Sequence, residues 1–197
     1  MVELLRALRW HLHHWDVALS YRWALRREPA TRPAGYWFAR LCAHMGDGWL
    51  WGLVAWLLWR RWNTGGDSAA DGVNRRWMLA AWVVNMLATA GLTLWIKHHI
   101  RRPRPGVARL MYGRGPDIHS FPSGHAARLG TISVWASSLL PGWGRLAWPL
   151  AALIGWSRVR LGIHYVGDVF AGFLLGAGLA WLFRRHLPSL PIFRRIG

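Results

Sequence analysis

The sequence predicts an all-α protein: an integral membrane helical bundle with five to six transmembrane helices. Its composition is one reason, because 53% of the 197 residues are hydrophobic and 17 are Trp. Its charge is the second, because 25 Lys and Arg oppose only 8 acids, and many of the basic residues stand where apolar runs end. Trp and Arg in such places are typical of anchors at the membrane surface. The length predicts one domain, residues 1–197.

Residues 1–30 predict an amphipathic helix that lies in the membrane interface. Apolar residues recur there at helical spacing, with Arg and His on the other faces; they are Leu4, Leu5, Leu8, Leu12, Trp15 and Leu19. Charged residues interrupt the stretch, so we do not interpret it as a cleavable signal peptide. A crossing helix would give a simpler topology but would bury several charges, and both arrangements stay open.

Five later runs approach the length of about 20 mostly apolar residues that a spanning helix needs. They are residues 36–59, 77–96, 125–140, 146–156 and 165–183. The second is the cleanest, because only Asn85 interrupts it, while the third and fourth are short. Residues 63–72, with the sequence NTGGDSAADG, are predicted to form a flexible polar loop.

Arg residues in short loops predict the orientation of the bundle. Segment 60–76 and the C-terminal tail are both rich in Arg, which places them on the cytoplasmic side. The connection 97–124 and the turn 157–164 then fall on the outer side. That connection nevertheless carries six basic residues: Lys97, Arg101, Arg102, Arg104, Arg109 and Arg114. Basic residues on this side suggest that the charges have a local role.

His164 and Asp168 are four residues apart at the start of the last apolar run, so they share one helix face. A carboxylate there can accept a hydrogen bond from one imidazole nitrogen and leave the other free as a nucleophile. Asp168 is also costly in an apolar helix unless it is paired. The alternative is a helix-terminal His with an Asp that caps the first turn.

The tetrapeptide Pro122-Ser123-Gly124-His125 precedes another apolar run. Taken alone, Ser123 is an ordinary helix N-cap. A Ser-Gly helix start also presents backbone N–H groups to an anion, and the helix dipole favours negative charge there. In that interpretation His125 stands beside the anion, placed for proton transfer.

The third cluster is KHHIRRPRP, from Lys97 to Pro105. Arg side chains bind phosphate oxygens in a bidentate manner, and Lys adds a point charge. The alternative is a basic anchor on anionic lipid headgroups. An anchor would not need the rigid Pro framework and would favour the cytoplasmic side.

Together these clusters resemble the three signature motifs of the type 2 phosphatidic acid phosphatase family. This family includes bacterial membrane lipid phosphatases, glucose-6-phosphatase and the vanadium haloperoxidases. The positions that match, in order and with the family spacing, are Lys97, Arg104-Pro105, Pro122-Ser123-Gly124-His125, Ser157-Arg158, His164 and Asp168. The resemblance spans residues 97–168 and implies the family's helical core, shared with the haloperoxidases.

The resemblance also implies a role for each residue, at a site on the outer end of the bundle. His164 is then the nucleophile and forms a phosphohistidine, Asp168 orients it, and His125 protonates the leaving-group oxygen before activating water. The phosphoryl oxygens would be held by Lys97, Arg104, Arg158, Ser123 and the Gly124 amide. We expect the other basic residues, Arg101, Arg102 and Arg160, to contact a second phosphate or lipid headgroups.

We expect no metal and no other cofactor at this site. Three cations and a helix N-terminus can stabilise a phosphoryl group by themselves. With 8 acids in the chain, no dense carboxylate cluster is available for magnesium. The residues His98, His99 and His119 could imitate a zinc site, but adjacent His side chains diverge on a helix.

The predicted function is a membrane lipid phosphatase whose substrate keeps its tail in the bilayer. The surplus Arg residues favour a diphosphate, and undecaprenyl diphosphate is the favoured candidate. Phosphatidate, phosphatidylglycerophosphate and the lipid A 1-phosphate are alternatives, as is phosphate transfer to a second lipid. We expect a multi-pass protein of the bacterial inner (cytoplasmic) membrane, with the site facing the periplasm or outer side.

Three other functions are disfavoured. An anionic-lipid-binding scaffold explains the charge and the Trp residues but leaves the His164–Asp168 pair unexplained. A nucleic-acid binder would carry its basic residues along a water-soluble face rather than at span ends. A haloperoxidase is disfavoured because those relatives resemble larger soluble proteins, whereas this chain is predicted to be mostly membrane-spanning. The sequence sets no oligomeric state.

Overall fold

The protein is all-α in the computed structural model, which describes residues 2–24, 34–64, 69–105, 117–140, 142 and 144–186. Its helices are α1 Val2–Trp23, α2 Ala34–His44, α3 Gly48–Thr64, α4 Ala69–Ile100, α6 Gly124–Leu139, the short 3₁₀ helix η1 Gly144–Leu146, α7 Ala147–Arg160 and α8 Val166–His186. No strand occurs in these ranges, so the predicted fold class is confirmed.

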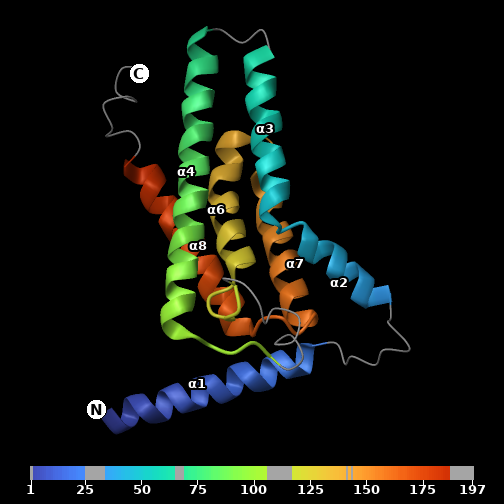
Figure 1. Cartoon of the computed structure of the whole chain (residues 1–197), viewed down its shortest axis with the longest axis vertical. Helices are drawn as coiled ribbons and strands as arrows, with labels where there is room; N and C mark the ends of the chain where they lie inside the picture. The colour runs from blue at the N-terminus through green and yellow to red at the C-terminus, as the bar shows by residue number, and fades with distance from the viewer. Residues whose placement is uncertain are drawn as a thin grey trace.

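The helices α3, α4, α6, α7 and α8 form a bundle, and α1 lies across one of its ends (Figure 1). Helix α6 is central, because it packs against α4, α7 and α8. Helix α2 turns away from the bundle and packs against α7. The end that α1 crosses is also where α4 finishes and where α6 and α8 begin (Figure 1). Residues distant in the sequence therefore meet at this end.

Small residues bring α6 and α8 into close contact. A Cβ atom on Gly176 of α8 would overlap the carbonyl oxygen of Ala127 on α6. A Cβ atom on Gly172, one turn earlier, would overlap the carbonyl oxygen of Ser123. Gly130 of α6 faces the α8 backbone in the same way. Glycine on both helices thus allows their backbones to touch.

Buried polar bonds tie α4 to the same central helix. The Nε1 of Trp135 donates to Oδ1 of Asn85 over 2.9 Å, and the hydroxyls of Thr89 and Thr131 are 3.0 Å apart. Asn85, the one interruption in the apolar run of α4, therefore has a partner inside the bundle. Such a pairing lowers the cost of a polar side chain in an apolar span.

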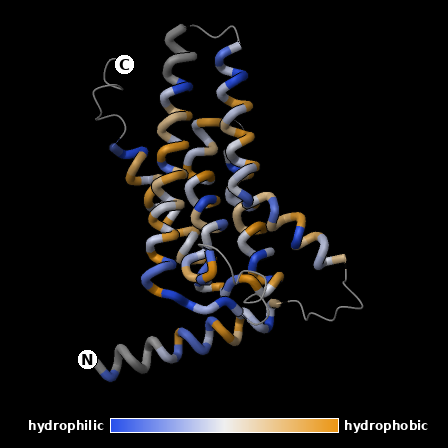
Figure 2. Tube along the Cα trace, in the orientation of Figure 1, coloured by the Kyte–Doolittle hydropathy of each residue, from blue (hydrophilic) through white to orange (hydrophobic). Residues whose placement is uncertain are grey.

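Two helical segments are long and apolar enough to cross a membrane, Arg75–Ile100 and Val166–His186. Figure 2 shows hydrophobic residues along the bundle helices and a hydrophilic stretch where α4 ends. Large apolar side chains such as Leu87, Trp95 and Leu174 are more than half exposed on the bundle surface, as expected of lipid-facing helices. The number of five to six spans stays a prediction.

Two expectations about the elements were wrong. Residues 36–59 are not one span, because the chain turns at Met45–Asp47 and divides them into α2 and α3. The loop expected at 63–72 is shorter, because α3 continues to Thr64 and α4 begins at Ala69. Ala69 and Ala70 are strong helix formers, which favours this early start. Residues 1–30 do form a helix over Val2–Trp23, and its position in the membrane interface stays a prediction.

Candidate active site

Two cations from the basic segment converge at the end of α4. Lys97 and Arg104 are both almost fully buried. The Nζ of Lys97 donates to the backbone oxygen of His119 over 2.7 Å and lies 2.9 Å from Oδ1 of Asp117. The guanidinium of Arg104 donates to the backbone oxygen of Asp117 over 2.7 Å and lies 3.2 Å from the same Oδ1. The two predicted phosphate ligands thus face one point.

Asp117, which belongs to none of the three motifs, occupies that point. Its side chain is 48% exposed, while those of its two cationic partners are buried. Burial opposes ionisation, but Lys97 and Arg104 outweigh it and hold the pKa of Asp117 below its ordinary value. The sequence feature that could have identified Asp117 is that it is an acid in a connection otherwise rich in Arg.

His164 lies in the turn between α7 and α8 and is buried. Its Nε2 is 3.2 Å from NH1 of Arg104, so the imidazole faces the cations. The turn is fixed by the backbone N–H groups of Ile163 and His164, which both donate to the backbone oxygen of Arg158. Burial and the charges of Arg104, Arg158 and Lys97 hold the pKa of His164 well below its usual value. The imidazole is therefore neutral at physiological pH.

Asp168 lies behind His164, in the first turn of α8, and is fully buried. Its Oδ2 is 3.6 Å from Nδ1 of His164, which is too long for a hydrogen bond, and accepts from the backbone N–H of Tyr165 over 2.9 Å. Its Oδ1 accepts from Arg102 over 2.7 Å. The expectation that Arg102 meets substrate or headgroups was wrong, because that guanidinium is bound inside the protein.

The start of α6 is joined to the start of α8. The backbone N–H of Ser123 donates to the backbone oxygen of Asp168 over 2.9 Å. The Ser123 hydroxyl caps α6 by accepting from the N–H of Ala126, at a long 3.5 Å. The capping role considered for Ser123 is therefore present. Gly124 opens the helix beside it, after the cis peptide bond Phe121–Pro122.

His125 has a partner that the motifs do not contain. Its Nε2 lies 2.9 Å from Oδ1 of Asp47, in the turn between α2 and α3, and the other oxygen of Asp47 lies 2.9 Å from Nδ1 of His44. Asp47 stands inside the apolar run 36–59 and belongs to none of the three motifs. An acid inside an apolar run was itself the signal that it has a partner.

Arg158 completes the group of cations. It is buried, and it lies close enough to both His164 and His125 to influence their charges. Within the part of the chain that the structure describes, its Nε and the Nδ1 of His164 are buried without a hydrogen-bond partner. Buried polar atoms are rarely left unsatisfied, so the Nε of Arg158 is available to a ligand, whereas the Nδ1 of His164 faces Asp168.

The NH1 of Arg160 donates to the backbone oxygen of Trp23 over 2.8 Å, and its contact with a second phosphate or lipid headgroups stays a prediction. Arg109 and Arg114 lie outside the described residues. The candidates His98, His99 and His119 do not form a zinc site: the described ranges contain no group of three His, Cys, Asp or Glu side chains that could hold a metal ion.

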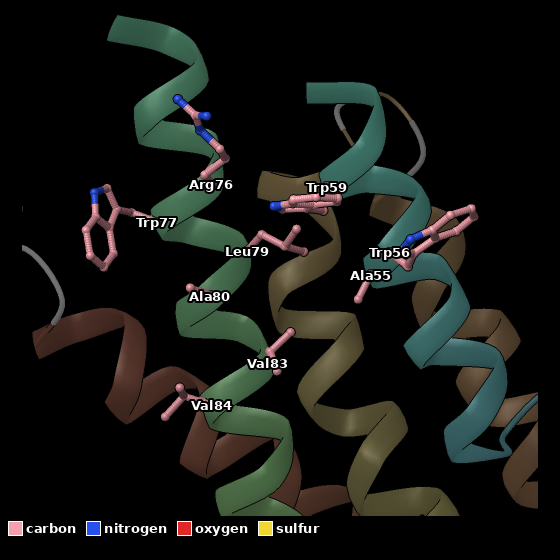
Figure 3. A pocket seen from close by; sticks show the side chains of 9 residues that line it. All are labelled: Ala55, Trp56, Trp59, Arg76, Trp77, Leu79, Ala80, Val83 and Val84. Carbon is pink, nitrogen blue, oxygen red and sulfur yellow. The ribbon is translucent and has the colours of Figure 1, made fainter. Parts of the chain in front are cut away.

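A cavity of about 710 Å³ opens elsewhere, between α3 and α4 (Figure 3). Trp56, Trp59, Trp77 and Val84 line it, and Arg76 lies at its rim. Lys97 lies about 20 Å beyond Val84 along the axis of α4, at a rise of about 1.5 Å per residue. This apolar cavity is therefore separate from the cationic site.

The fold and the site together form a helical bundle that brings several cations and two His side chains together at one end. The sequence profile of the PAP2 superfamily matches residues 78–190. The chain belongs to this superfamily, as its motifs predicted.

Curated relatives of the chain are lipid phosphatases by name. It is 33% identical over 111 residues to phosphatidylglycerophosphatase B of Bacillus subtilis, covering 51% of this chain and 53% of that protein. It is 39% identical over 71 residues to an undecaprenyl-diphosphatase of Sulfolobus acidocaldarius, covering 34% of this chain and 33% of that protein. It is 31% identical over 159 residues to the decaprenylphosphoryl-5-phosphoribose phosphatase of Mycobacterium tuberculosis, covering 78% of this chain and 81% of that protein.

The matches thus span about half and one third of the first two relatives. Among solved structures, the transmembrane PAP2-type phosphatidylglycerolphosphate phosphatase from Bacillus subtilis superposes with a TM-score of 0.67 at 26% identity, covering 93% of this chain and 90% of that one. Aquifex aeolicus LpxE shares the fold, with a TM-score of 0.59 at 23% identity and coverage of 79% and 88%.

Proposed function

We propose that the protein is a metal-independent lipid phosphatase that works through a phosphohistidine on His164. One observation carries the proposal: a neutral, buried imidazole stands with Nε2 beside Arg104 and Nδ1 toward Asp168. A nitrogen that accepts from Arg104 holds its lone pair there, so the proton of the ring is on Nδ1. Asp168 favours this tautomer, and Nε2 is the nucleophile.

In the first step, Nε2 of His164 attacks phosphorus and the bond from phosphorus to the leaving oxygen breaks. Lys97, Arg104 and Arg158 stabilise the charge on the phosphoryl oxygens. The Gly124 amide and Ser123, at the start of α6, add donors and a favourable helix dipole. His125 gives a proton to the leaving oxygen, and Asp47 holds its ring.

In the second step, water attacks the phosphohistidine. His125, which has lost a proton, takes one from that water, and the phosphorus–nitrogen bond breaks. Inorganic phosphate leaves, and both His side chains return to their starting protonation states. Each step needs only groups that lie at this end of the bundle.

The substrate we propose is a lipid phosphate, with undecaprenyl diphosphate favoured. The names of the relatives support the class: they include an undecaprenyl-diphosphatase, a phosphatidylglycerophosphatase and a decaprenylphosphoryl-5-phosphoribose phosphatase. Phosphatidate, phosphatidylglycerophosphate and lipid A 1-phosphate are the alternatives. Arg102 is bound to carboxylates within the protein, which removes one of the charges that favoured a diphosphate.

We further propose that the protein resides in the bacterial inner membrane with this site on its outer face. The Arg-rich segment 60–76 lies at the opposite end of α4 from Lys97, which supports that orientation. A lipid whose tail stays in the bilayer can then present its headgroup to the site.

The test is phosphate release by the purified protein in detergent with chelator present, for each lipid in turn. Wild type should release phosphate, and His164→Ala should lose at least about 1,000-fold of kcat. His186→Ala, at the far end of α8, is the matched control. Activity that survives in His164→Ala would refute the nucleophile, and loss of wild-type activity on chelation would refute the metal-free mechanism.

Phosphate transfer to another lipid is the second candidate, because the phosphohistidine is common to both reactions. An acceptor lipid added to the assay separates them. Phosphorylated acceptor in place of inorganic phosphate would identify a transferase.

A further inference from the structure

Helix α1 contacts the catalytic end of the bundle through Asp16. Its Oδ2 accepts from NH2 of Arg102 over 2.7 Å, while NH1 of the same guanidinium donates to Asp168, also over 2.7 Å. One Arg therefore joins a carboxylate of α1 to the carboxylate behind His164. Arg102 also lies over the ring of Tyr165, 4.1 Å from its centroid. The guanidinium therefore has contacts at both terminal nitrogens and on its planar face, and these contacts restrict its orientation.

The second oxygen of Asp16 binds the start of α8. Its Oδ1 accepts from the backbone N–H of Gly167 over 2.7 Å, and Oγ of Ser20 accepts from the N–H of Val166 over 2.9 Å. These are the first two residues of α8, whose N–H groups have no partner within the helix. Asp16 and Ser20 thus cap α8 from a separate helix, and a carboxylate suits the positive end of its dipole.

The approach of α1 depends on Gly167. A Cβ atom there would lie 2.8 Å from Oδ2 of Asp16, closer than side chains pack. Arg160 holds the other end of the contact, because it donates to the backbone oxygen of Trp23 at the end of α1. Four side chains from three segments, Asp16 and Ser20 of α1 together with Arg102 and Arg160, therefore attach α1 to the turn that carries His164.

The orientation of Asp168 rests on this attachment. Its Oδ1 is set by Arg102 and its Oδ2 by the N–H of Tyr165, and Oδ2 is the oxygen that faces His164. Without Asp16, Arg102 loses its anchor on α1 and is free to turn with the carboxylate that it holds. We propose that Asp16 and Arg102 are positioning residues for Asp168 and that α1 is part of the catalytic assembly. This inference rests on the proposed function.

The test compares Asp16→Asn, Arg102→Gln and the double variant in the full-length protein. Asp16→Asn keeps the shape but faces Arg102 with an uncharged amide. We expect kcat to fall about 10- to 100-fold in each single variant, with KM within about twofold of wild type. The matched control is Glu3→Gln, which removes the other acid of α1, an exposed side chain, and should match wild type.

The double variant separates positioning from folding. If Asp16 acts through Arg102, its loss costs nothing more once Arg102 is gone, so the double variant should be within about twofold of Arg102→Gln. Multiplying effects, or a kcat of Asp16→Asn equal to wild type, would overturn the inference and leave the proposed function intact. A wild-type protein inactive on every lipid would overturn both.

Discussion

Replacing Gly176 with Ala tests whether the contact between α6 and α8 builds the site. A Cβ atom at this position would overlap the carbonyl oxygen of Ala127 and lie 2.6 Å from its carbonyl carbon. Backbone atoms cannot rotate away, so the helices must separate until the Ala127 carbonyl oxygen, the nearest atom, is at an ordinary contact of 3.4 Å or more. Overpacking of this kind costs about 1–3 kcal/mol, and a rigid backbone partner favours the upper value.

The cost should also appear at the site. The backbone N–H of Ser123, which caps α6, donates to the backbone oxygen of Asp168 on α8 over 2.9 Å, and this bond lengthens when the helices separate. We therefore expect Gly176→Ala to lower both the thermal midpoint in detergent and kcat. The measurement is a melting curve with phosphate release on the same preparation.

Gly178, two residues further along α8, is the matched control. A Cβ atom there would meet nothing within 4 Å. Ala in place of an exposed helical Gly is favourable by about 1 kcal/mol, so Gly178→Ala should melt at or above wild type. If Gly176→Ala melted like Gly178→Ala, the close backbone contact between α6 and α8 would be refuted.

Three further predictions concern the charges of the site. Asp117→Asn should lower KM about fivefold, because the half-exposed carboxylate competes with substrate for Lys97 and Arg104; a higher KM would show that it assists binding. Asp47→Asn should lower kcat about 10- to 100-fold on lipid phosphates, because Asp47 holds the ring of His125. The kcat on an aryl phosphate should stay unchanged, since its leaving oxygen needs no proton. Equal losses on both substrates would contradict this role. The pKa of His164 is depressed and its neutral form reacts, so the acid limb of the kcat/KM profile should lie below about pH 6.5. This limb should move to higher pH in Arg158→Gln, because a neighbouring positive charge is removed. A limb that does not move would exclude Arg158 as a cause of the depressed pKa.

The amino-acid sequence by itself determined the helical class and predicted most residues of the candidate site. Residues that follow one another at the end of a helix stay together however the helices pack. That is why Lys97 and Arg104, or His164 and Asp168, were readable from their spacing. The same local reasoning found the capped start of α6 at Ser123.

Only the tertiary structure decided which partners those residues have. Asp47 meets His125 across 78 positions, Arg102 meets Asp168 across 66, and Asp16 meets Arg102 across 86. Such pairs depend on how α1, the turn before α3 and the start of α8 meet at one end of the bundle. Local spacing carries no information about that packing, so an acid in an amphipathic helix and a second Arg in a basic segment gained a role only when the helices were assembled.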